Sequence, residues 1–313
     1  MKAVQINIYG GSDVLEINET APKPSAHKGQ VLVEVYAASI NPVDWKLRAG
    51  YLKDWMPVQF PATQGGDFAG IVLQIGEGVS KFKLGDKLYG SAFVLNGGSG
   101  AFGQVAAVNI ANSAYKPKSV NFEEAAALPL VGASAIQALE EHIKLQAGQK
   151  ILIHGGAGGI GSIAIQLAKA MGAYVATTVS PDDKDYVKKL GADEVIDYKN
   201  EKFEDLLADY DAVFDTVGGE TTSKSFKVLK KGGIIVSMLG QPDPKFAKEH
   251  EVTAIGQGTD TNFKHLTRLA ELVDSGKIKV TVDKIFSLDQ VKEAFDYQEK
   301  NSPRGKVVIQ CKT

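Results

Sequence analysis

The sequence predicts an α/β protein with a doubly wound parallel sheet in one domain and a second, mostly β, partly barrel-like domain. Three observations support this fold class. The chain has 313 residues, and at roughly 150 residues per domain two domains are expected. Short strands and turns fill about the first 120 residues, and strands then alternate with helices. Glycine, at 33 residues, exceeds its usual share of about 7% and marks turns and close backbone approaches.

The N-terminal part shows the pattern of half-buried strands. Gln30 to Ala37 alternates apolar and polar residues with a period of two, and Phe68 to Ile75 is a second apolar run. Glycines and prolines separate such runs. An antiparallel, partly barrel-like domain fits this pattern.

The pattern changes near Asn121, which with Glu123 and Glu124 predicts a helix start. A helix over 134–143 and a strand–helix series follow. Strands are expected over 150–154, 174–179, 194–198, 212–216 and 233–237, and helices over 159–171, 182–190 and 221–229. This alternation predicts a parallel sheet with helices on both faces.

The C-terminal tail returns to a mixed pattern. Leu288 to Glu299 predicts an amphipathic helix and Lys306 to Gln310 a strand. We expect this tail to rejoin the N-terminal domain. The expected domains are therefore residues 1–120 with 276–313, and residues 121–275.

The glycine loop at 155–161 is the most specific motif. An apolar strand runs into Gly156-x-Gly158-x-x-Gly161, and the loop includes Gly159 and Ile160 at the start of an apolar helix. In this strand–loop–helix context the spacing is typical of a Rossmann dinucleotide site, where a pyrophosphate approaches Gly158 and the helix N-terminus. The alternative is a glycine-rich turn without a ligand.

The end of the next strand distinguishes NADP(H) from NAD(H). An NAD site usually has an acidic residue there, whereas this chain has Thr177 to Ser180, followed by Lys184. A hydroxyl and a lysine suit a 2′-phosphate, so NADP(H) is the expected cofactor. Asp182 and Asp183 argue against this choice, unless they are acids of a helix start.

Composition excludes several other classes. The formal net charge is −2 and no long basic run occurs, so neither nucleic acid nor an anionic membrane surface is an expected partner. The single cysteine, Cys311, allows no internal disulfide and no cysteine-rich zinc site. No signal-peptide pattern and no apolar run of about 20 residues is present, so a cytoplasmic location is the expectation.

Several motifs in order resemble the medium-chain dehydrogenase/reductase superfamily, and within it the zinc-independent quinone oxidoreductase branch that includes zeta-crystallin and plant enone oxidoreductases. The resemblance covers the whole chain and implies a GroES-like catalytic domain beside the Rossmann domain. Besides the glycine loop, the motifs are SINPVD at 39–44, GGDFAG at 65–70, GDKLYG at 85–90, FDTVGG at 214–219 and GKVVI at 305–309.

The resemblance also argues against catalytic zinc. Zinc members of the superfamily have Cys and His where this chain has Asn41 and Gly66, and neither residue is a thiolate or imidazole ligand. The five histidines show no ligand spacing. No metal is therefore expected.

Site residues follow from the same resemblance. Relatives bind the nicotinamide between the domains, which implies that Val131, Val217 and Gly218 border it. Ser180, Lys184 and Tyr198 correspond to the 2′-phosphate and ribose site, and Lys306 or Arg304 to a tail residue that reaches the cofactor. Tyr198 as a packing aromatic and Arg304 as a surface residue are the alternatives.

Asn41 and Tyr51 are the candidate catalytic residues, as hydrogen-bond donors to an acceptor oxygen. Conjugation spreads the charge that hydride transfer creates, which favours a quinone, enone or enal as substrate in a site without zinc. Bacterial quinone reductases have tyrosines where this chain has Lys46 and Leu52, which leaves the choice between quinone and enone open.

An NADPH-dependent quinone or enone reductase is therefore the expected function. An enoyl-thioester reductase, and a non-catalytic NADPH-binding sensor or crystallin-like protein, are the alternatives. A homodimer is expected, because the strand at 233–237 lies near the sheet edge that pairs subunits in relatives.

Overall fold

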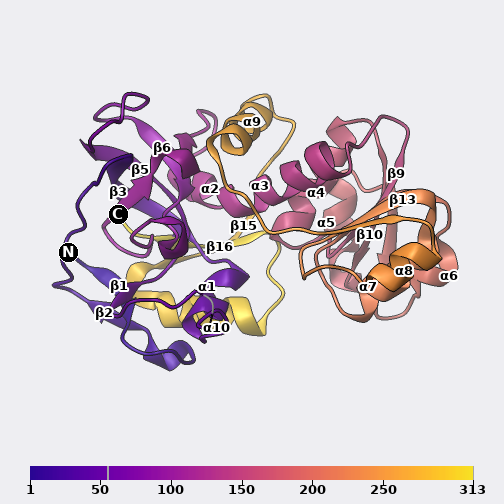
Figure 1. Ribbon diagram of the computed structural model, residues 1–313, viewed down its shortest axis with the longest axis horizontal. Coiled ribbons are helices and arrows are strands. Elements are labelled where there is room, and N and C mark those ends of the chain that lie inside the picture. The colour runs from indigo at the N-terminus through magenta and orange to yellow at the C-terminus, as the bar shows by residue number, and fades with distance from the viewer. Residues whose placement is uncertain (55, 313) are drawn as a thin grey trace. The chain divides into compact units, whose positions relative to one another are not determined.

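The computed structural model describes residues 1–54 and 56–312. Contacts divide the chain into two compact units (Figure 1). The first contains residues 1–130, 261–275 and the chain from Val280 onward, and the second contains 131–260 and 276–279. The unit boundaries thus differ from the expected domain boundaries, because residues 121–130 and 261–275 pack on the first unit and 276–279 on the second. For example, the Tyr89 hydroxyl donates to the carbonyl oxygen of Leu266 (2.6 Å).

The first unit contains two sheets. The larger has the strand order β15-β16-β3-β5-β6-β8, with β7 paired to β3, and the smaller has the order β2-β1-β4. The strands are β1 (Ala3–Ile6), β2 (Glu16–Asn18), β3 (Gln30–Ser39), β4 (Ala62–Thr63), β5 (Asp67–Ile75), β6 (Lys87–Ser91), β7 (Val105–Asn109), β8 (Ser113–Tyr115), β15 (Val282–Ser287) and β16 (Lys306–Gln310). The helices are α1 (Pro42–Arg48), α2 (Phe122–Ala126), α9 (Phe263–Asp274) and α10 (Val291–Lys300).

Apolar side chains at alternate positions build the core of the first unit. Val31, Val33 and Val35 of β3 are all buried, as the period-two pattern predicts. Phe295 of α10 packs in the same core, beside Phe102. The strand β16 pairs antiparallel with β3, so the tail completes the sheet of the N-terminal part.

The second unit is a six-stranded sheet in which every neighbouring pair is parallel. Its order is β11-β10-β9-β12-β13-β14. The strands are β9 (Lys150–His154), β10 (Tyr174–Val179), β11 (Glu194–Asp197), β12 (Tyr210–Asp215), β13 (Leu229–Ser237) and β14 (Thr253–Gly256). The helices are α4 (Gly159–Ala170), α5 (Lys184–Lys189), α6 (Phe203–Leu206), α7 (Glu220–Ser225) and α8 (Pro244–Glu249).

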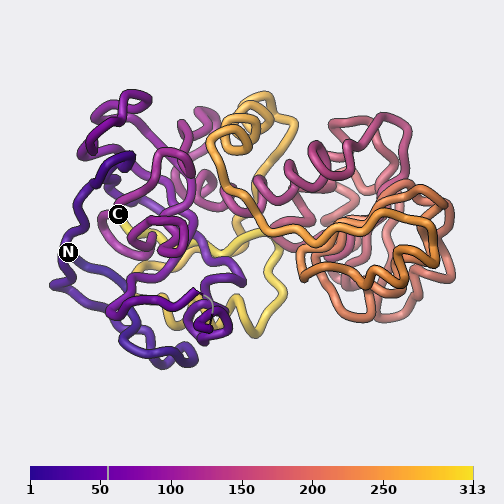
Figure 2. The backbone as a smooth tube through the Cα atoms, in the orientation of Figure 1, coloured from indigo at the N-terminus to yellow at the C-terminus, as the bar shows by residue number. Residues whose placement is uncertain are grey.

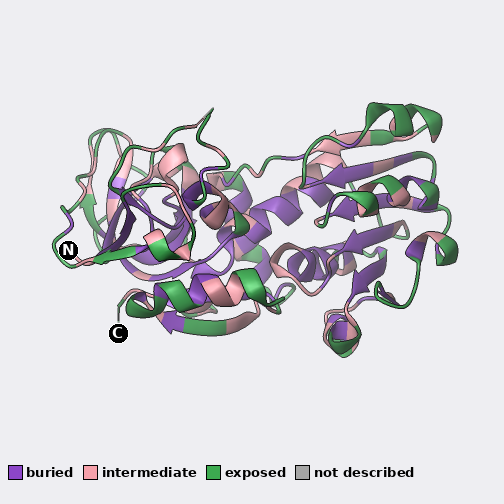
Figure 3. Cartoon of the chain, turned by 90° about the horizontal axis from the view of Figure 1, so that it is seen from below, coloured by how far each residue is buried: buried purple, intermediate pink, exposed green. Residues whose placement is uncertain are grey.

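This order is that of a Rossmann sheet, which confirms the predicted fold class. The chain winds from β9 to β11 in one direction and from β12 to β14 in the other. Right-handed crossovers therefore place α4 and α5 on one face and α7 and α8 on the opposite face (Figures 1 and 2). The strands between them are largely buried (Figure 3). The order reverses between β9 and β12, where such sheets bind ligands.

Most predicted elements are confirmed, with differences at helix ends. Asn121 caps α2 through its side chain, which accepts from the Glu124 N–H (2.8 Å). The helix expected over 134–143 begins earlier, as α3 (Pro129–Ile136), and continues as a π-helical turn, Gln137–His142. The helix expected to reach Leu229 ends sooner, because Leu229 already pairs with Tyr210 as the first residue of β13. Among the described residues, no helix is long and apolar enough to cross a membrane.

Candidate cofactor and active site

The glycine loop has the shape that a phosphate group requires. Gly155 turns the chain with a φ of +72°. A Cβ on Gly156 would overlap the Thr177 hydroxyl, and a Cβ on Gly161 would overlap the carbonyl oxygen of Gly155. At Gly158 the nearest atom to an added Cβ is the Gly155 carbonyl oxygen at 3.5 Å, an ordinary contact distance, so this residue is less crowded than the other two. Gly156 and Gly161 thus permit close packing, and Gly158 permits close approach of a ligand.

The first turn of α4 supplies donors next to Gly158. The helical hydrogen bonds of α4 begin at Ser162, whose N–H donates to the carbonyl oxygen of Gly158 (2.9 Å). The N–H groups of Gly159, Ile160 and Gly161 precede it and point from the positive end of the helix dipole. Such an end binds phosphate without a side-chain charge.

Beneath this loop lies a buried hydrogen-bonded histidine. The Ser225 hydroxyl donates to the carbonyl oxygen of Thr221 (2.6 Å), so it accepts from His154 Nε2–H (2.9 Å). His154 Nδ1 is then an acceptor for the Thr178 hydroxyl (2.9 Å). Burial lowers the pKa of His154 to about 4, although nearby Asp215 opposes the shift, which agrees with a neutral imidazole.

The loop after β12 meets the glycine loop where the strand order reverses. The Asp215 carboxylate accepts from the backbone N–H groups of Val217 (2.9 Å) and Gly218 (3.0 Å) and from the Thr222 hydroxyl. The Thr216 hydroxyl donates to the carbonyl oxygen of His154 (2.7 Å). Asp215 therefore fixes the turn that carries Val217, whose side chain is exposed. Val131, also predicted to border the nicotinamide, is buried in α3.

A hydroxyl, an ammonium group and several carboxylates lie together at the end of β10. The Ser180 hydroxyl donates to Asp183 Oδ2 (2.6 Å). Lys184 Nζ lies 3.9 Å from Asp197 Oδ2 and 3.6 Å from Glu201 Oε2. The Tyr198 side chain is 58% exposed and does not pack as a buried strand-end aromatic. The predicted 2′-phosphate residues thus lie on neighbouring strand ends, with carboxylates among them.

In the first unit, a buried polar network surrounds Asn41. Lys306 Nζ donates to the carbonyl oxygen of Ile40 (2.6 Å) and to Asn41 Oδ1. Asn41 Nδ2 donates to Asp67 Oδ2 (2.9 Å). The Asn41 backbone N–H donates to Asp44 Oδ2 (2.7 Å). We call Asn41, Asp44, Asp67 and Lys306 the Asn41 network.

Strand register brings the Asn41 network together. Val308 of β16 pairs with Ser39 of β3, and Ser39 pairs with Asp67 of β5. Two residues further along this antiparallel pair, Lys306 lies opposite Asn41. The network therefore forms at one end of three neighbouring strands.

Burial shifts the pKa of every charged group in the network. Desolvation raises the pKa of Asp44 to about 7, and Asp67 adds to this rise while the Asn41 N–H and Lys306 oppose it. Desolvation also raises the pKa of Asp67 and lowers that of Lys306, against the attraction between their opposite charges. The opposite charges of Lys306 and the two carboxylates counteract these shifts.

Other predicted residues lie apart from this network. Tyr51 is 70% exposed, and its ring packs edge-on against Trp45 at a centroid distance of 5.8 Å. Arg304 is exposed, and its backbone N–H donates to Asp283 Oδ1 (3.3 Å). Within residues 1–54 and 56–312, Asn41 bonds to Asp44, Asp67 and Lys306, and Tyr51 is not among its partners. Asp67 and His154 are functional candidates that the sequence did not single out.

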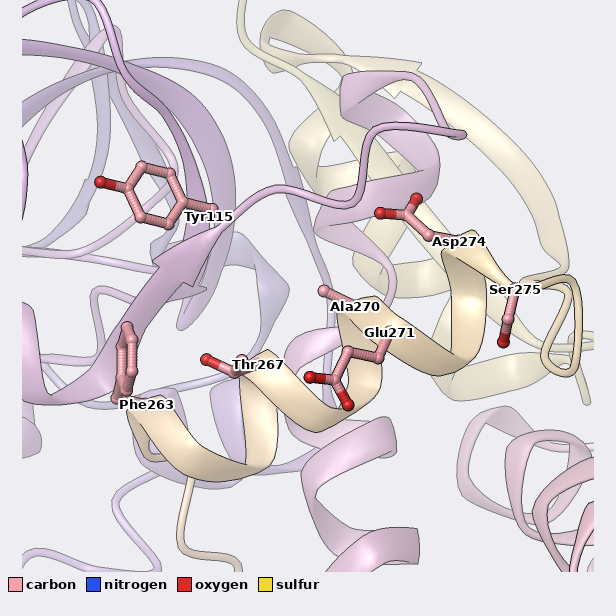
Figure 4. Close-up of a pocket in the computed structure, with 7 residues that line it drawn as sticks. All are labelled: Tyr115, Phe263, Thr267, Ala270, Glu271, Asp274 and Ser275. Carbon is pink, nitrogen blue, oxygen red and sulfur yellow. The ribbon is translucent and has the colours of Figure 1, made fainter.

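Among the described residues, no predicted site residue belongs to a metal site or to the pocket along α9. In the described part of the chain, no three His, Cys, Asp or Glu side chains are placed to hold a metal ion. A pocket of about 490 Å³ lies along α9 of the first unit (Figure 4). It is lined by Tyr115, Phe263, Thr267, Ala270, Glu271, Asp274 and Ser275.

Comparison with known proteins agrees with this geometry. Two family profiles match, the alcohol dehydrogenase GroES-like domain over residues 27–118 and the zinc-binding dehydrogenase over residues 190–309. The 2-methylene-furan-3-one reductase of Solanum lycopersicum is 40% identical over 99% of this chain and 79% of its own length. The chloroplastic NADPH-dependent alkenal/one oxidoreductase of Arabidopsis thaliana is 38% identical over the same shares.

A solved structure is similar as well. The quinone oxidoreductase of Coxiella burnetii superposes with a TM-score of 0.90 at 33% identity and covers 100% of this chain and 99% of that one. The chain therefore belongs to the medium-chain dehydrogenase/reductase superfamily. Within it, the chain falls in the branch of quinone and alkenal/one oxidoreductases, as its motifs predict.

Proposed function

We propose that this protein is an NADPH-dependent reductase of quinones or α,β-unsaturated carbonyl compounds. The main observation is the glycine loop around Gly158, next to the donor end of α4, where the strand order of the Rossmann sheet reverses. Relatives named as NADPH-dependent and quinone reductases support the same reading. The enoyl-thioester reductase and the sensor have no comparable support.

The residues present fit a nicotinamide dinucleotide phosphate. The N–H groups of Gly159, Ile160 and Gly161 would bind the pyrophosphate, and Val217 and Gly218 would border the nicotinamide beside Val131. Ser180, Lys184 and Tyr198 would bind the 2′-phosphate and ribose. Asp183 already accepts the Ser180 proton, so that hydroxyl must turn from the carboxylate to donate to a phosphate.

For the remaining tail residue, we assign contact with the cofactor to Arg304 rather than to Lys306. Arg304 is exposed, whereas Lys306 is buried and 5% exposed. Arg304 is therefore the tail residue that we expect to contact the cofactor.

When bound, the cofactor supplies a hydride, and the chain must stabilise the charge that this creates on the acceptor oxygen. The Asn41 amide is the donor we assign to that oxygen, with Tyr51 as a second donor or a route for the proton. Preorganised donors of this kind commonly contribute factors of about 10² to 10³ in kcat. A conjugated acceptor needs less of this help than a simple ketone.

The test is the rate of cofactor oxidation with NADPH and with NADH. The acceptors would be 9,10-phenanthrenequinone, an enone and a 2-alkenal. Turnover that is at least tenfold more efficient with NADPH would support the proposal, and the best acceptor would give the subclass. Tight NADPH binding without turnover of any acceptor would contradict it and favour the sensor.

We also propose a homodimer. The strand β14 forms the outer edge of the six-stranded sheet, one strand beyond the expected residues 233–237. An open edge offers unpaired N–H and carbonyl groups to a second copy. Light scattering behind size exclusion would give about twice the chain mass of 33.4 kDa if this is right, and the monomer mass if it is not.

A further inference from the structure

The orientation of the Asn41 amide follows from the chemistry of its two partners. An ammonium group only donates hydrogen bonds, and an ionised carboxylate only accepts them. Lys306 faces one end of the amide and Asp67 the other. Turning the amide over would set its NH₂ group against the ammonium and its oxygen against the carboxylate. The oxygen of Asn41 must therefore face Lys306 and its nitrogen must face Asp67.

We propose that Lys306 is a positioning residue for the reductase reaction. It holds Asn41 so that the amide offers an N–H, not its oxygen, to the acceptor, and its ammonium places a positive charge behind that donor. This inference rests on the proposed function. Asn41 Nδ2 has two hydrogens, and within the described residues one of them bonds to Asp67. The other is the donor that the acceptor oxygen would use.

The charge of Lys306 lies directly beside the Asn41 amide. Its ammonium donates to Asn41 Oδ1 and to the carbonyl oxygen of Ile40, and both side chains are buried. A low dielectric strengthens the effect of such a cation on a negative charge that develops nearby.

Burial makes the arrangement rigid. Asn41 is 1% exposed and Lys306 is 5% exposed. The ammonium bonds the Ile40 carbonyl oxygen as well as the amide, and the Ile40 N–H donates to Val307 (3.0 Å). The lysine is thus fixed by the β16–β3 pairing and not by a flexible side chain alone. Because Asn41 is this buried, an acceptor must displace the groups that cover the amide before it can accept from it, but the amide itself is already held in place.

The first test measures the amide directly, without cofactor or substrate. Side-chain 15N-asparagine labelling of the full chain, with Asn41→Ala used to assign the signal, reports its two amide protons. Lys306→Met is expected to shift this signal and to speed its exchange with water at least tenfold. Lys312→Met, a surface lysine of the same tail that pairs with Glu34, should leave it unchanged. An Asn41 signal that Lys306→Met does not alter overturns the positioning role.

The second test measures turnover. Lys306→Met should lower kcat for an enone by about 10- to 100-fold while the KM for NADPH changes less than about threefold. The loss with a quinone should be smaller, because a quinone spreads the charge. The double variant Asn41→Ala/Lys306→Met should be no slower than Asn41→Ala by more than about twofold, because the lysine acts through the amide. Losses that multiply in the double variant overturn the inference.

A charge-balanced variant guards against misfolding. Lys306→Met leaves two buried carboxylates without their cation, whereas Asp67→Asn/Lys306→Met removes one negative charge and keeps an acceptor for Asn41 Nδ2. This double variant should fold and retain the same loss with the enone, and recovery of the wild-type rate overturns the inference. If the wild type reduces no acceptor, the proposed function and the catalytic role of Lys306 both fail. The amide measurement then decides the positioning role separately.

Discussion

Replacing Lys184 by Met should change the choice between NADPH and NADH. In the proposed site the ammonium of Lys184 binds the 2′-phosphate, which NADH lacks. A hydrogen bond to a charged group contributes about 1.5–3 kcal/mol. Lys184 is already shared with Asp197 at 3.9 Å and Glu201 at 3.6 Å, so the lower end of this range applies. About 1.5 kcal/mol corresponds to roughly a tenfold rise in the KM for NADPH.

The assay compares kcat/KM for NADPH and NADH with one acceptor at a fixed, saturating concentration. Lys184→Met should lower the NADPH/NADH ratio about tenfold and leave the NADH value within about twofold. Lys188→Met is the matched control, because Lys188 lies on the exposed side of the same helix, α5. Equal losses with both cofactors, or none with either, would refute the assignment of Lys184 to the 2′-phosphate.

Three further predictions concern stability and the glycine loop. Gly161→Ala should lower the free energy of unfolding in urea by about 1–3 kcal/mol, because its Cβ overlaps the Gly155 carbonyl oxygen, whereas Gly158→Ala should fold normally and raise the KM for NADPH. Equal stability of the two variants would contradict this reading of the loop. His154 has a pKa of about 4 in the fold against its usual 6.5, so it contributes stability above pH 6.5 that is lost as pH falls toward 4, at most about 3 kcal/mol. His154→Asn should reduce that loss in unfolding measured from pH 7 to 4, and an unchanged slope would argue against it. Asp44 is the opposite case: its raised pKa means that stability is present at low pH and lost as pH rises through about 7. Asp44→Asn should therefore raise the melting temperature more at pH 8 than at pH 5, and an equal rise would show that its charge is not the cause.

Local patterns predicted most of the second unit but missed α6, α8 and β14. The strands 150–154 and 174–179 were predicted with their observed ends, because a parallel strand buried on both faces is rich in apolar and β-branched residues. The glycine loop was predictable for a related reason: strand, glycines and helix are adjacent in sequence. The helix ends were less predictable, since Leu229 could end a helix or begin a strand, and its pairing with Tyr210 decides this.

The Asn41 network was beyond local patterns. Asn41 and Lys306 are far apart in sequence, and only the β16–β3 register brings them together. The family resemblance offered Lys306 or Arg304 as the tail residue that reaches the cofactor. A lysine is usually exposed, so the burial of Lys306 was not expected. Its burial depends on carboxylates from two other elements, α1 and β5. A local residue pattern cannot predict that side chains from β16, α1 and β5 contact one another.

Both units use a buried carboxylate for the same purpose. Asp215 accepts from the N–H groups of Val217 and Gly218 and so fixes a turn of the proposed cofactor site. Asp67 accepts from Asn41 and from the Leu130 N–H (3.3 Å) and so fixes the proposed donor to the acceptor. Burying a charge is costly, and these hydrogen bonds offset part of that cost. The same bonds hold the turn and the Asn41 amide in place. A donor that is already in place stabilises a developing negative charge without reorganising first, and this does not require a metal ion.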